Sequence, residues 1–382
     1  MMNVDVVIER ARERAGVDTF HSESFREGLD IVAEAVTADP KSPERERRIT
    51  HECTRALVSR LRVDDWLRSY PDVAESAVTS PVFVIGMPRT GTTVLVNLIG
   101  QDRESCRVIW NWEIDQPTPP ADPMHLLDDP RIAVKVAKLA PVREMLSHLP
   151  RMELATDPVE CVHVLAQDFK SLFWQLSTGS ARYDDWFLDE ADLRSAYLHH
   201  RRTLQVLQSG GAKGQWVLKL PSHALHLEAL LSVYPDARLV ITHRDPLQSL
   251  VSMCSYAKMM HQVNGNQITH EEVISTTWRH VLDSAIRTVD FVTVHPEVPT
   301  YNVYQGELAA DPIEQVNLLR AWIGLEPNDD LDARIRHYLK TDWPHPPGSH
   351  RYTASDFAVT RAAVDEAFAP YTTAFDVPSE DE

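Results

Sequence analysis

The sequence lacks most of the features that mark secreted, metal-binding or membrane-spanning chains. Its four cysteines, Cys53, Cys106, Cys161 and Cys254, lie far apart and form no Cys-x-x-Cys pair. This spacing argues against a disulfide framework and against a cysteine zinc site. No apolar run approaches the length of a membrane span, and the N-terminus has no basic segment followed by an apolar core. We therefore predict neither a signal peptide nor integral membrane association, and we expect a cytoplasmic protein.

Basic residues are also scarce. The chain has 38 Lys and Arg against 56 Asp and Glu, which gives a formal net charge of -18. Such an acidic body repels nucleic acid and anionic membranes, so neither is an expected partner. An anionic ligand must therefore enter a locally basic pocket. The length of 382 residues, with 43% hydrophobic residues, predicts a globular protein with one large core.

The order of predicted elements indicates an α/β fold. Apolar residues at helical spacing predict an N-terminal helical extension over residues 1–80, packed on the core. The remaining residues, 81–382, are predicted to form one α/β domain with a mostly helical insertion over about 114–212. Strands are predicted at 82–86, 106–110, 215–220, 238–242 and 300–305. Because strands and helices alternate, the sheet should be mostly parallel.

The stretch "GMPRTGTT", residues 86–93, lies between the first predicted strand and a helix. The spacing of Gly86 and Gly91 is that of a nucleotide-triphosphate loop, but Thr92 replaces the lysine and Arg89 lies inside the loop. Helix N-termini at the carboxyl ends of parallel strands bind anions. We predict a phosphate-type cradle whose ligand is met by arginine. The residues expected to bind it are Arg89, Thr90, Gly91, Thr92 and Thr93.

A second cluster, "THRDPLQSLVS", spans residues 242–252. Arg244 ends a predicted strand and Ser252 lies two turns into the next helix, so both could meet a further anionic group. No acidic residue ends this strand directly, as the magnesium-holding acid of a nucleotide triphosphatase would, and no His-Glu-x-x-His pattern occurs. We predict no metal site.

Together these motifs resemble those of the sulfotransferases that use 3′-phosphoadenosine 5′-phosphosulfate. "GMPRTGTT" resembles their 5′-phosphosulfate loop, and "HRDPLQSLVS" resembles their 3′-phosphate motif. "KLPSH" from Lys219 and the segment from Tyr301, which includes Tyr304, resemble further family segments. The similarity covers about 81–113 and 215–325 and is closest to a bacterial branch related to tyrosylprotein and carbohydrate sulfotransferases. It implies a P-loop-like three-layer fold and this donor as co-substrate.

The resemblance also implies catalytic roles. Arg89, the loop N–H groups and Lys219 would meet the charge that develops on the leaving oxygen. Glu113 lies where glutamate-using relatives place their general base, and His223 is its competitor. Glu160 is more simply explained as part of a helix capping box that starts at Asp157.

Other assignments stay open at this stage. His163 fits a core histidine, whereas Arg351 and Tyr352 in the tail could close over the 3′-phosphate or the adenine. The acceptor would be a hydroxylated small molecule, lipid or carbohydrate. The alternative functions are a P-loop kinase and a non-catalytic nucleotide-binding protein. A homo-oligomer is compatible with the sequence.

Overall fold

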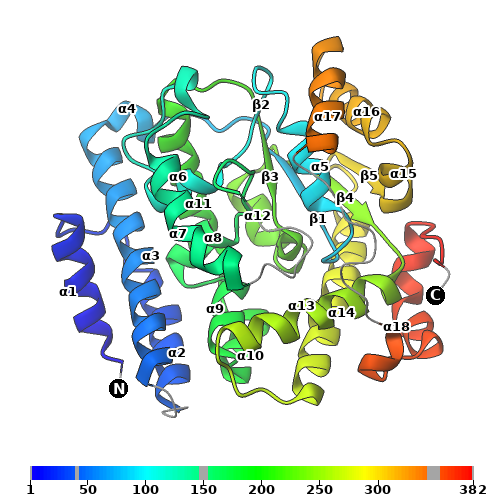
Figure 1. The fold of residues 1–382 in the computed structure, drawn as a ribbon, viewed down its shortest axis with the longest axis horizontal. Helices are drawn as coiled ribbons and strands as arrows, with labels where there is room; N and C mark the ends of the chain where they lie inside the picture. The colour runs from blue at the N-terminus through cyan, green and yellow to red at the C-terminus, as the bar shows by residue number, and fades with distance from the viewer. Residues whose placement is uncertain (1, 39–42, 146–153, 342–352, 381–382) are drawn as a thin grey trace.

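The computed structural model describes residues 2–38, 43–145, 154–341 and 353–380. Its centre is a parallel sheet of five strands in the order β2-β3-β1-β4-β5 (Figure 1). The strands are β1 (Val82–Gly86), β2 (Cys106–Arg107), β3 (Gln215–Lys219), β4 (Arg238–His243) and β5 (Thr300–Tyr304). The predicted α/β class and parallel sheet are confirmed.

The central strand β1 is buried on both faces. Val82 and Val84 belong to one hydrophobic cluster, whereas Phe83 and Ile85 belong to another. Successive side chains of a strand point to opposite faces, so the sheet separates two cores. This arrangement gives the three layers of a doubly covered α/β fold.

Helices from both ends of the chain cover the Phe83 face. The N-terminal helices on this face are α1 (Val4–Ala15), α2 (Phe25–Ala38) and α3 (Pro43–Ser69), whereas α4 (Pro71–Ala74) packs in a small separate cluster with α3 and α11. The later helices that contribute to this core include α11 (Arg194–Ser209), α12 (Leu227–Val233), α13 (Pro246–Val263), α14 (His270–Val294) and α18 (Arg361–Ala374). Figure 1 shows α1 to α3 side by side at one end of the molecule and α18 at the other.

The Val84 face is covered by a second set of helices. These are α5 (Thr92–Ile99), α15 (Gln305–Ala310), α16 (Pro312–Trp322) and α17 (Asp329–Thr341). Asp311 caps α16 by accepting from the Glu314 N–H at 3.0 Å, as its position before Pro312 predicts. These helices hold α5, and therefore the loop before it, against the sheet.

The segment between β2 and β3 is mostly helical but more broken than its periodicity predicts. Besides α11, its helices are α6 (Asn111–Asp115), η1 (Pro123–His125), α7 (Arg131–Met145), α8 (Val162–Leu165), η2 (Ala166–Asp168), α9 (Leu172–Thr178) and α10 (Ala181–Asp189). The remaining short helices of the chain are η3 (Pro221–Leu225) and η4 (Ala354–Phe357). The strand predicted over 106–110 ends at Arg107, because Ile109 accepts instead from the Val159 N–H at 2.8 Å.

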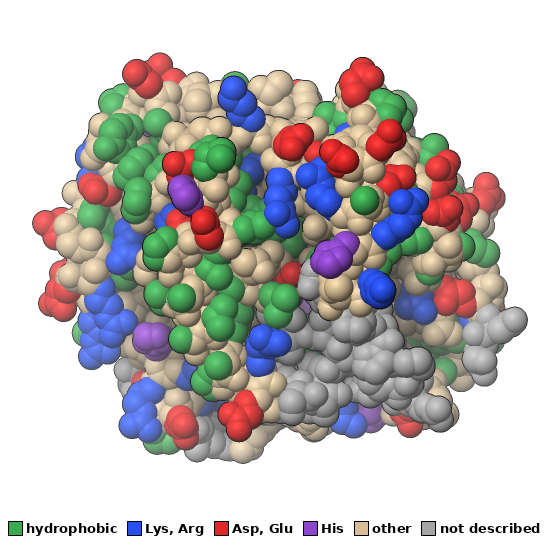
Figure 2. Space-filling model, turned by 45° about the horizontal axis from the view of Figure 1, so that its top comes forward, with side chains coloured by type: hydrophobic (Ala, Val, Ile, Leu, Met, Phe, Trp, Pro, Cys, Tyr) green, Lys and Arg blue, Asp and Glu red, His purple; other side chains and the backbone are tan. Residues whose placement is uncertain are grey.

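The surface mixes both signs of charge. Figure 2 shows Lys and Arg side chains between Asp and Glu side chains on one face, with hydrophobic side chains among them. The excess of Asp and Glu therefore forms no continuous acidic patch on this face. Among the described residues, no helix is both long and apolar enough to cross a bilayer.

Candidate active site

The loop between β1 and α5 has the backbone that its glycines predict. Gly86 has φ +138°, and a Cβ there would lie 2.5 Å from the Thr242 carbonyl oxygen on β4. Gly91 has φ +97° and is the N-cap of α5, with no side chain capping the helix. Both conformations favour glycine. The unpaired N–H groups at the start of α5 are thus available to an anion.

The three loop threonines have different surroundings. Thr90 is fully buried, and its hydroxyl donates to the Met87 carbonyl at 2.7 Å and contacts the Thr242 hydroxyl at 2.5 Å. It therefore braces the loop from inside. Thr92 is also buried, whereas the Thr93 hydroxyl accepts from Lys219 Nζ at 3.1 Å. Thr93 thus connects the loop with β3.

Arg89 in the loop contacts Ser252 of the second motif, a pairing that the sequence motifs do not predict. Arg89 Nε donates to the Ser252 hydroxyl at 3.2 Å, and its guanidinium lies 5.9 Å from the ring centre of Tyr256. One turn earlier on α13, the Ser249 hydroxyl donates to the Pro88 carbonyl at 2.6 Å. Helix α13 therefore supports the loop and brings residues of the two sequence motifs, 86–93 and 242–252, into one site.

Arg244 lies at the end of β4 beside the same loop. Its Nη1 is 3.5 Å from the Arg89 carbonyl oxygen, and its other nitrogens pair with Glu380. Asp245 caps α13 by accepting from the Leu247 N–H at 2.8 Å, which orients the strand-to-helix turn. Arg244 and Ser252, the predicted pair, therefore both contact Arg89.

Lys219 ends β3 and connects the loop with a carboxylate. Its side chain is buried, and Nζ lies 3.1 Å from the Thr93 hydroxyl and 3.1 Å from Glu160 Oε1. The Glu160 side chain keeps 29% of its area exposed. A cation, a loop hydroxyl and an open carboxylate therefore meet at the carboxyl end of β3.

Glu160 is held there by an extended segment and not by a helix. The Val159 N–H donates to the Ile109 carbonyl at 2.8 Å, and the Cys161 N–H donates to the Lys219 carbonyl at 2.9 Å. Asp157 accepts from the Leu154 N–H, and α8 has no side-chain cap. The capping-box interpretation of Glu160 is therefore wrong, because the chain pairs with strand ends before it turns into α8.

Glu113 lies in a closed environment. Its carboxylate accepts from Arg107 Nη2 at 2.5 Å and from the Trp110 N–H at 3.0 Å, and the residue is 1% exposed. Both oxygens are thus engaged in holding the turn from β2 into α6. Its role as general base stays a prediction, whereas its structural contacts are explicit.

His223 lies in the core under the sheet. Its Nδ1 is 2.8 Å from the Tyr197 hydroxyl, its ring meets Phe83 edge-on, and the residue is fully buried. Burial lowers the pKa of His223 well below its ordinary value, so the ring is neutral.

Tyr304 lies at the end of β5, where its hydroxyl donates to the Phe375 carbonyl at 2.7 Å. It therefore ties the strand to the C-terminal segment. Its neighbour Gln305 approaches Gly91, since a Cβ at that glycine would lie 3.6 Å from Gln305 Cγ. Arg351 and Tyr352, the predicted tail contacts, lie outside the described residues.

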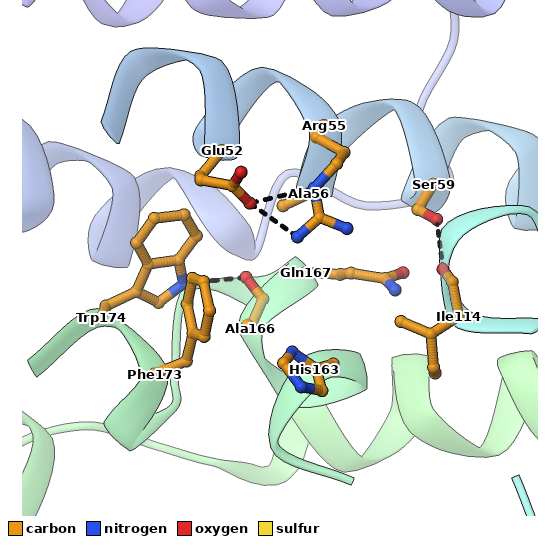
Figure 3. A pocket seen from close by; sticks show the side chains of 10 residues that line it. All are labelled: Glu52, Arg55, Ala56, Ser59, Ile114, His163, Ala166, Gln167, Phe173 and Trp174. Carbon is orange, nitrogen blue, oxygen red and sulfur yellow. Dashed lines mark hydrogen bonds and ion pairs between the residues drawn. The ribbon is translucent and has the colours of Figure 1, made fainter. Parts of the chain in front are cut away.

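A small cavity of about 20 Å³ lies near the turn that follows Glu160 (Figure 3). Its walls come from α3, α6, α8, η2 and α9 and include His163, Gln167 and Phe173. Burial lowers the pKa of His163 to about 3. The space suits about one water molecule, so it is too small for an acceptor.

Among the residues that the structure describes, no group of three or more His, Cys, Asp or Glu side chains could hold a metal ion. The four cysteines are buried thiols. Among the described side chains, the positive charge at this site comes from Arg89, Lys219 and Arg244.

Comparison with known proteins gives a consistent result. The model of the sulfotransferase family matches residues 81–330. The chain is 25% identical over 318 residues to omega-hydroxy-beta-dihydromenaquinone-9 sulfotransferase Stf3 of Mycobacterium bovis and of Mycobacterium tuberculosis. The alignment covers 77% of this chain and 74% of that relative.

Two solved structures resemble the whole chain. Sulfotransferase STF9 from Mycobacterium avium superposes with a TM-score of 0.89 at 31% identity and covers 100% of this chain and 99% of its own. Sulfotransferase STF1 from Mycobacterium tuberculosis has a TM-score of 0.83 at 26% identity, with 96% and 98% covered. Similarity therefore extends beyond the loop and includes the helical parts that the sequence motifs leave unexplained.

Proposed function

Because this chain belongs to the sulfotransferase family, we propose that it transfers a sulfuryl group from 3′-phosphoadenosine 5′-phosphosulfate to an acceptor hydroxyl. The observation that supports this donor most is the joint placement of Arg89, Ser252 and Arg244 beside an uncapped helix N-terminus. Such a site offers donors to two separate anionic groups. Family membership favours sulfuryl transfer over the kinase and the non-catalytic alternatives.

The two ends of the site bind different groups of the donor. The 5′-phosphosulfate lies on the N–H groups at the start of α5, near Arg89, where the helix dipole favours negative charge. The 3′-phosphate meets Arg244 and Ser252. Thr90 holds the loop in shape, and Tyr304 holds the end of β5 beside it.

The transfer step uses Lys219 and Glu160 as a pair. The acceptor oxygen attacks sulfur, and the bond between sulfur and the bridging oxygen breaks with its electron pair left on the 5′-phosphate. Lys219 and Arg89 stabilise that developing charge. Glu160 takes the acceptor proton, because it is the carboxylate that lies beside Lys219 and keeps exposed area. The products are a sulfate ester and 3′-phosphoadenosine 5′-phosphate.

The acceptor that we propose is a hydroxylated lipid-like molecule. The curated relative is named for an omega-hydroxylated dihydromenaquinone, a lipid-like hydroxylated acceptor. A panel of hydroxylated quinones, other lipids, sugars and phenols, assayed with labelled donor, tests this class. Sulfation of sugars alone would contradict it.

The donor assignment predicts selective nucleotide binding. 3′-Phosphoadenosine 5′-phosphate at one hundred times its dissociation constant should stabilise the fold by about 2.7 kcal/mol, which raises Tm by a few degrees. ADP, which lacks the 3′-phosphate, should raise it less. Thermal unfolding with each nucleotide measures the difference, and equal shifts would contradict the assignment of Arg244 and Ser252.

Arg89→Ala should lower kcat by about 10² to 10³, the effect of losing one well-placed charge-stabilising donor, about 2.7–4 kcal/mol. Donor binding should weaken as well, because the arginine contacts the nucleotide before and during transfer. Steady-state kinetics measure both effects. Arg10→Ala on the exposed side of α1 is the control. An Arg89→Ala enzyme with wild-type kcat would remove Arg89 from the mechanism.

A further inference from the structure

The C-terminal segment returns to the donor site and pairs with Arg244. Arg244 Nε donates to both Glu380 oxygens, at 3.1 and 3.3 Å, and Nη2 donates to Oε2 at 3.1 Å. The pair is thus a two-nitrogen fork on one carboxylate, the geometry in which arginine also binds phosphate. The two side chains keep 22% and 35% of their area exposed.

The fold anchors the Glu380 backbone. Its N–H donates to Asp245 Oδ2 at 2.7 Å, and its carbonyl accepts from Arg361 Nη2 at 3.2 Å. Arg361 in turn pairs with Asp245 at 2.7 Å. Although burial alone would raise it, hydrogen bonds from Arg361 and the Glu380 N–H hold the pKa of Asp245 below its ordinary value. These hydrogen bonds and the ion pair between Arg361 and Asp245 therefore place the carboxylate of Glu380 at Arg244.

The preceding helix fixes this segment to the sheet. The Tyr371 hydroxyl lies 2.8 Å from His243 Nδ1, and the Phe375 ring lies 4.6 Å from the His243 ring. Phe375 also accepts from the Tyr304 hydroxyl. The segment that carries Glu380 thus follows a helix that packs against the ends of β4 and β5, beside the proposed donor site.

When a phosphate approaches Arg244, the guanidinium is already paired with the carboxylate of Glu380. A carboxylate carries one negative charge, whereas a phosphate monoester carries about 1.5 to 2 and three acceptor oxygens. The phosphate therefore displaces the side chain of Glu380, while the backbone contacts to Asp245 can stay in place. A nucleotide with a free 3′-hydroxyl has no group that replaces the carboxylate.

From these contacts we infer that Glu380 is a specificity-determining residue, an internal counter-anion that occupies Arg244 and yields to the 3′-phosphate of the donor. This inference rests on the proposed function, because that function assigns the 3′-phosphate to Arg244. Glu380 lowers the affinity for every 3′-phosphorylated nucleotide and leaves other nucleotides unaffected.

Isothermal calorimetry on the full chain tests the inference with two nucleotides, 3′-phosphoadenosine 5′-phosphate and AMP. Glu380→Gln should bind the first about 5-fold more tightly than the wild type, the effect of removing one partly exposed ion pair. AMP affinity should not change. Glu366→Gln, which removes the same charge from an exposed position on α18, is the matched control and should change neither value.

Each other outcome has a distinct meaning. Equal or weaker binding of 3′-phosphoadenosine 5′-phosphate by Glu380→Gln would overturn the inference and make Glu380 a residue that positions Arg244. A similar gain with AMP would overturn it as well, since the effect would then be independent of the 3′-phosphate. If the wild type and the variant both fail to bind 3′-phosphoadenosine 5′-phosphate, the proposed function itself fails.

Discussion

Glu160→Gln is expected to lower kcat by about 10² to 10⁴, the range for loss of a general base, with the affinity for 3′-phosphoadenosine 5′-phosphate nearly unchanged. The amide keeps an oxygen that can accept from Lys219, which lies 3.1 Å from the carboxylate, but it cannot take the acceptor proton. Steady-state kinetics and nucleotide thermal shifts measure the two effects separately.

The comparison of kcat and nucleotide affinity decides what Glu160 does. A residue that only holds Lys219 in place would change donor binding together with turnover. If Glu160→Gln turns over normally, the base lies elsewhere, and Glu113 or His223 regains the role that the sequence predicts. Glu228→Gln, at an exposed position on α12, is a suitable charge control.

Glu113→Gln is expected to lower the free energy of unfolding by about 3–5 kcal/mol, the cost of breaking a buried ion pair by removing one partner. The change leaves the Arg107 guanidinium, which is 3% exposed, without its counter-charge. Urea denaturation measures the loss. Folded Glu113→Gln enzyme should retain most of its turnover.

Glu104→Gln is the matched control for this prediction, because Glu104 is exposed and precedes β2 by two residues. It should unfold at the same urea concentration as the wild type. A Glu113→Gln enzyme as stable as the wild type but without turnover would contradict the structural role and confirm Glu113 as the base.

Local patterns predict the conformation of the loop between β1 and α5 well. Gly86, Gly91 and Arg89 could be identified from spacing, because a strand, a tight turn and a helix N-terminus need adjacent residues of known types. The same holds for Arg244 and Ser252, which one strand and one helix bring to the loop. In each case the chemistry depends on few residues close in sequence.

The acidic partners could not be predicted in this way. Glu160 borders the site, whereas Glu113 is buried against Arg107. The difference depends on the pairing of Val159 with Ile109, 50 residues away in the chain. Glu380 reaches Arg244 across 136 residues. Such contacts depend on tertiary packing, which helical periodicity does not encode.

The hydrophobic cluster on the Phe83 face has a consequence for cooperativity. Residues 81–330 match the family, but this cluster also contains Phe25 from α2, Leu57 from α3 and Phe368 from α18. A chain cut to the matched region would expose the apolar side of the sheet to solvent. We therefore expect the smallest unit that folds cooperatively to be larger than residues 81–330, and we expect α2, α3 and α18 to unfold together with the sheet.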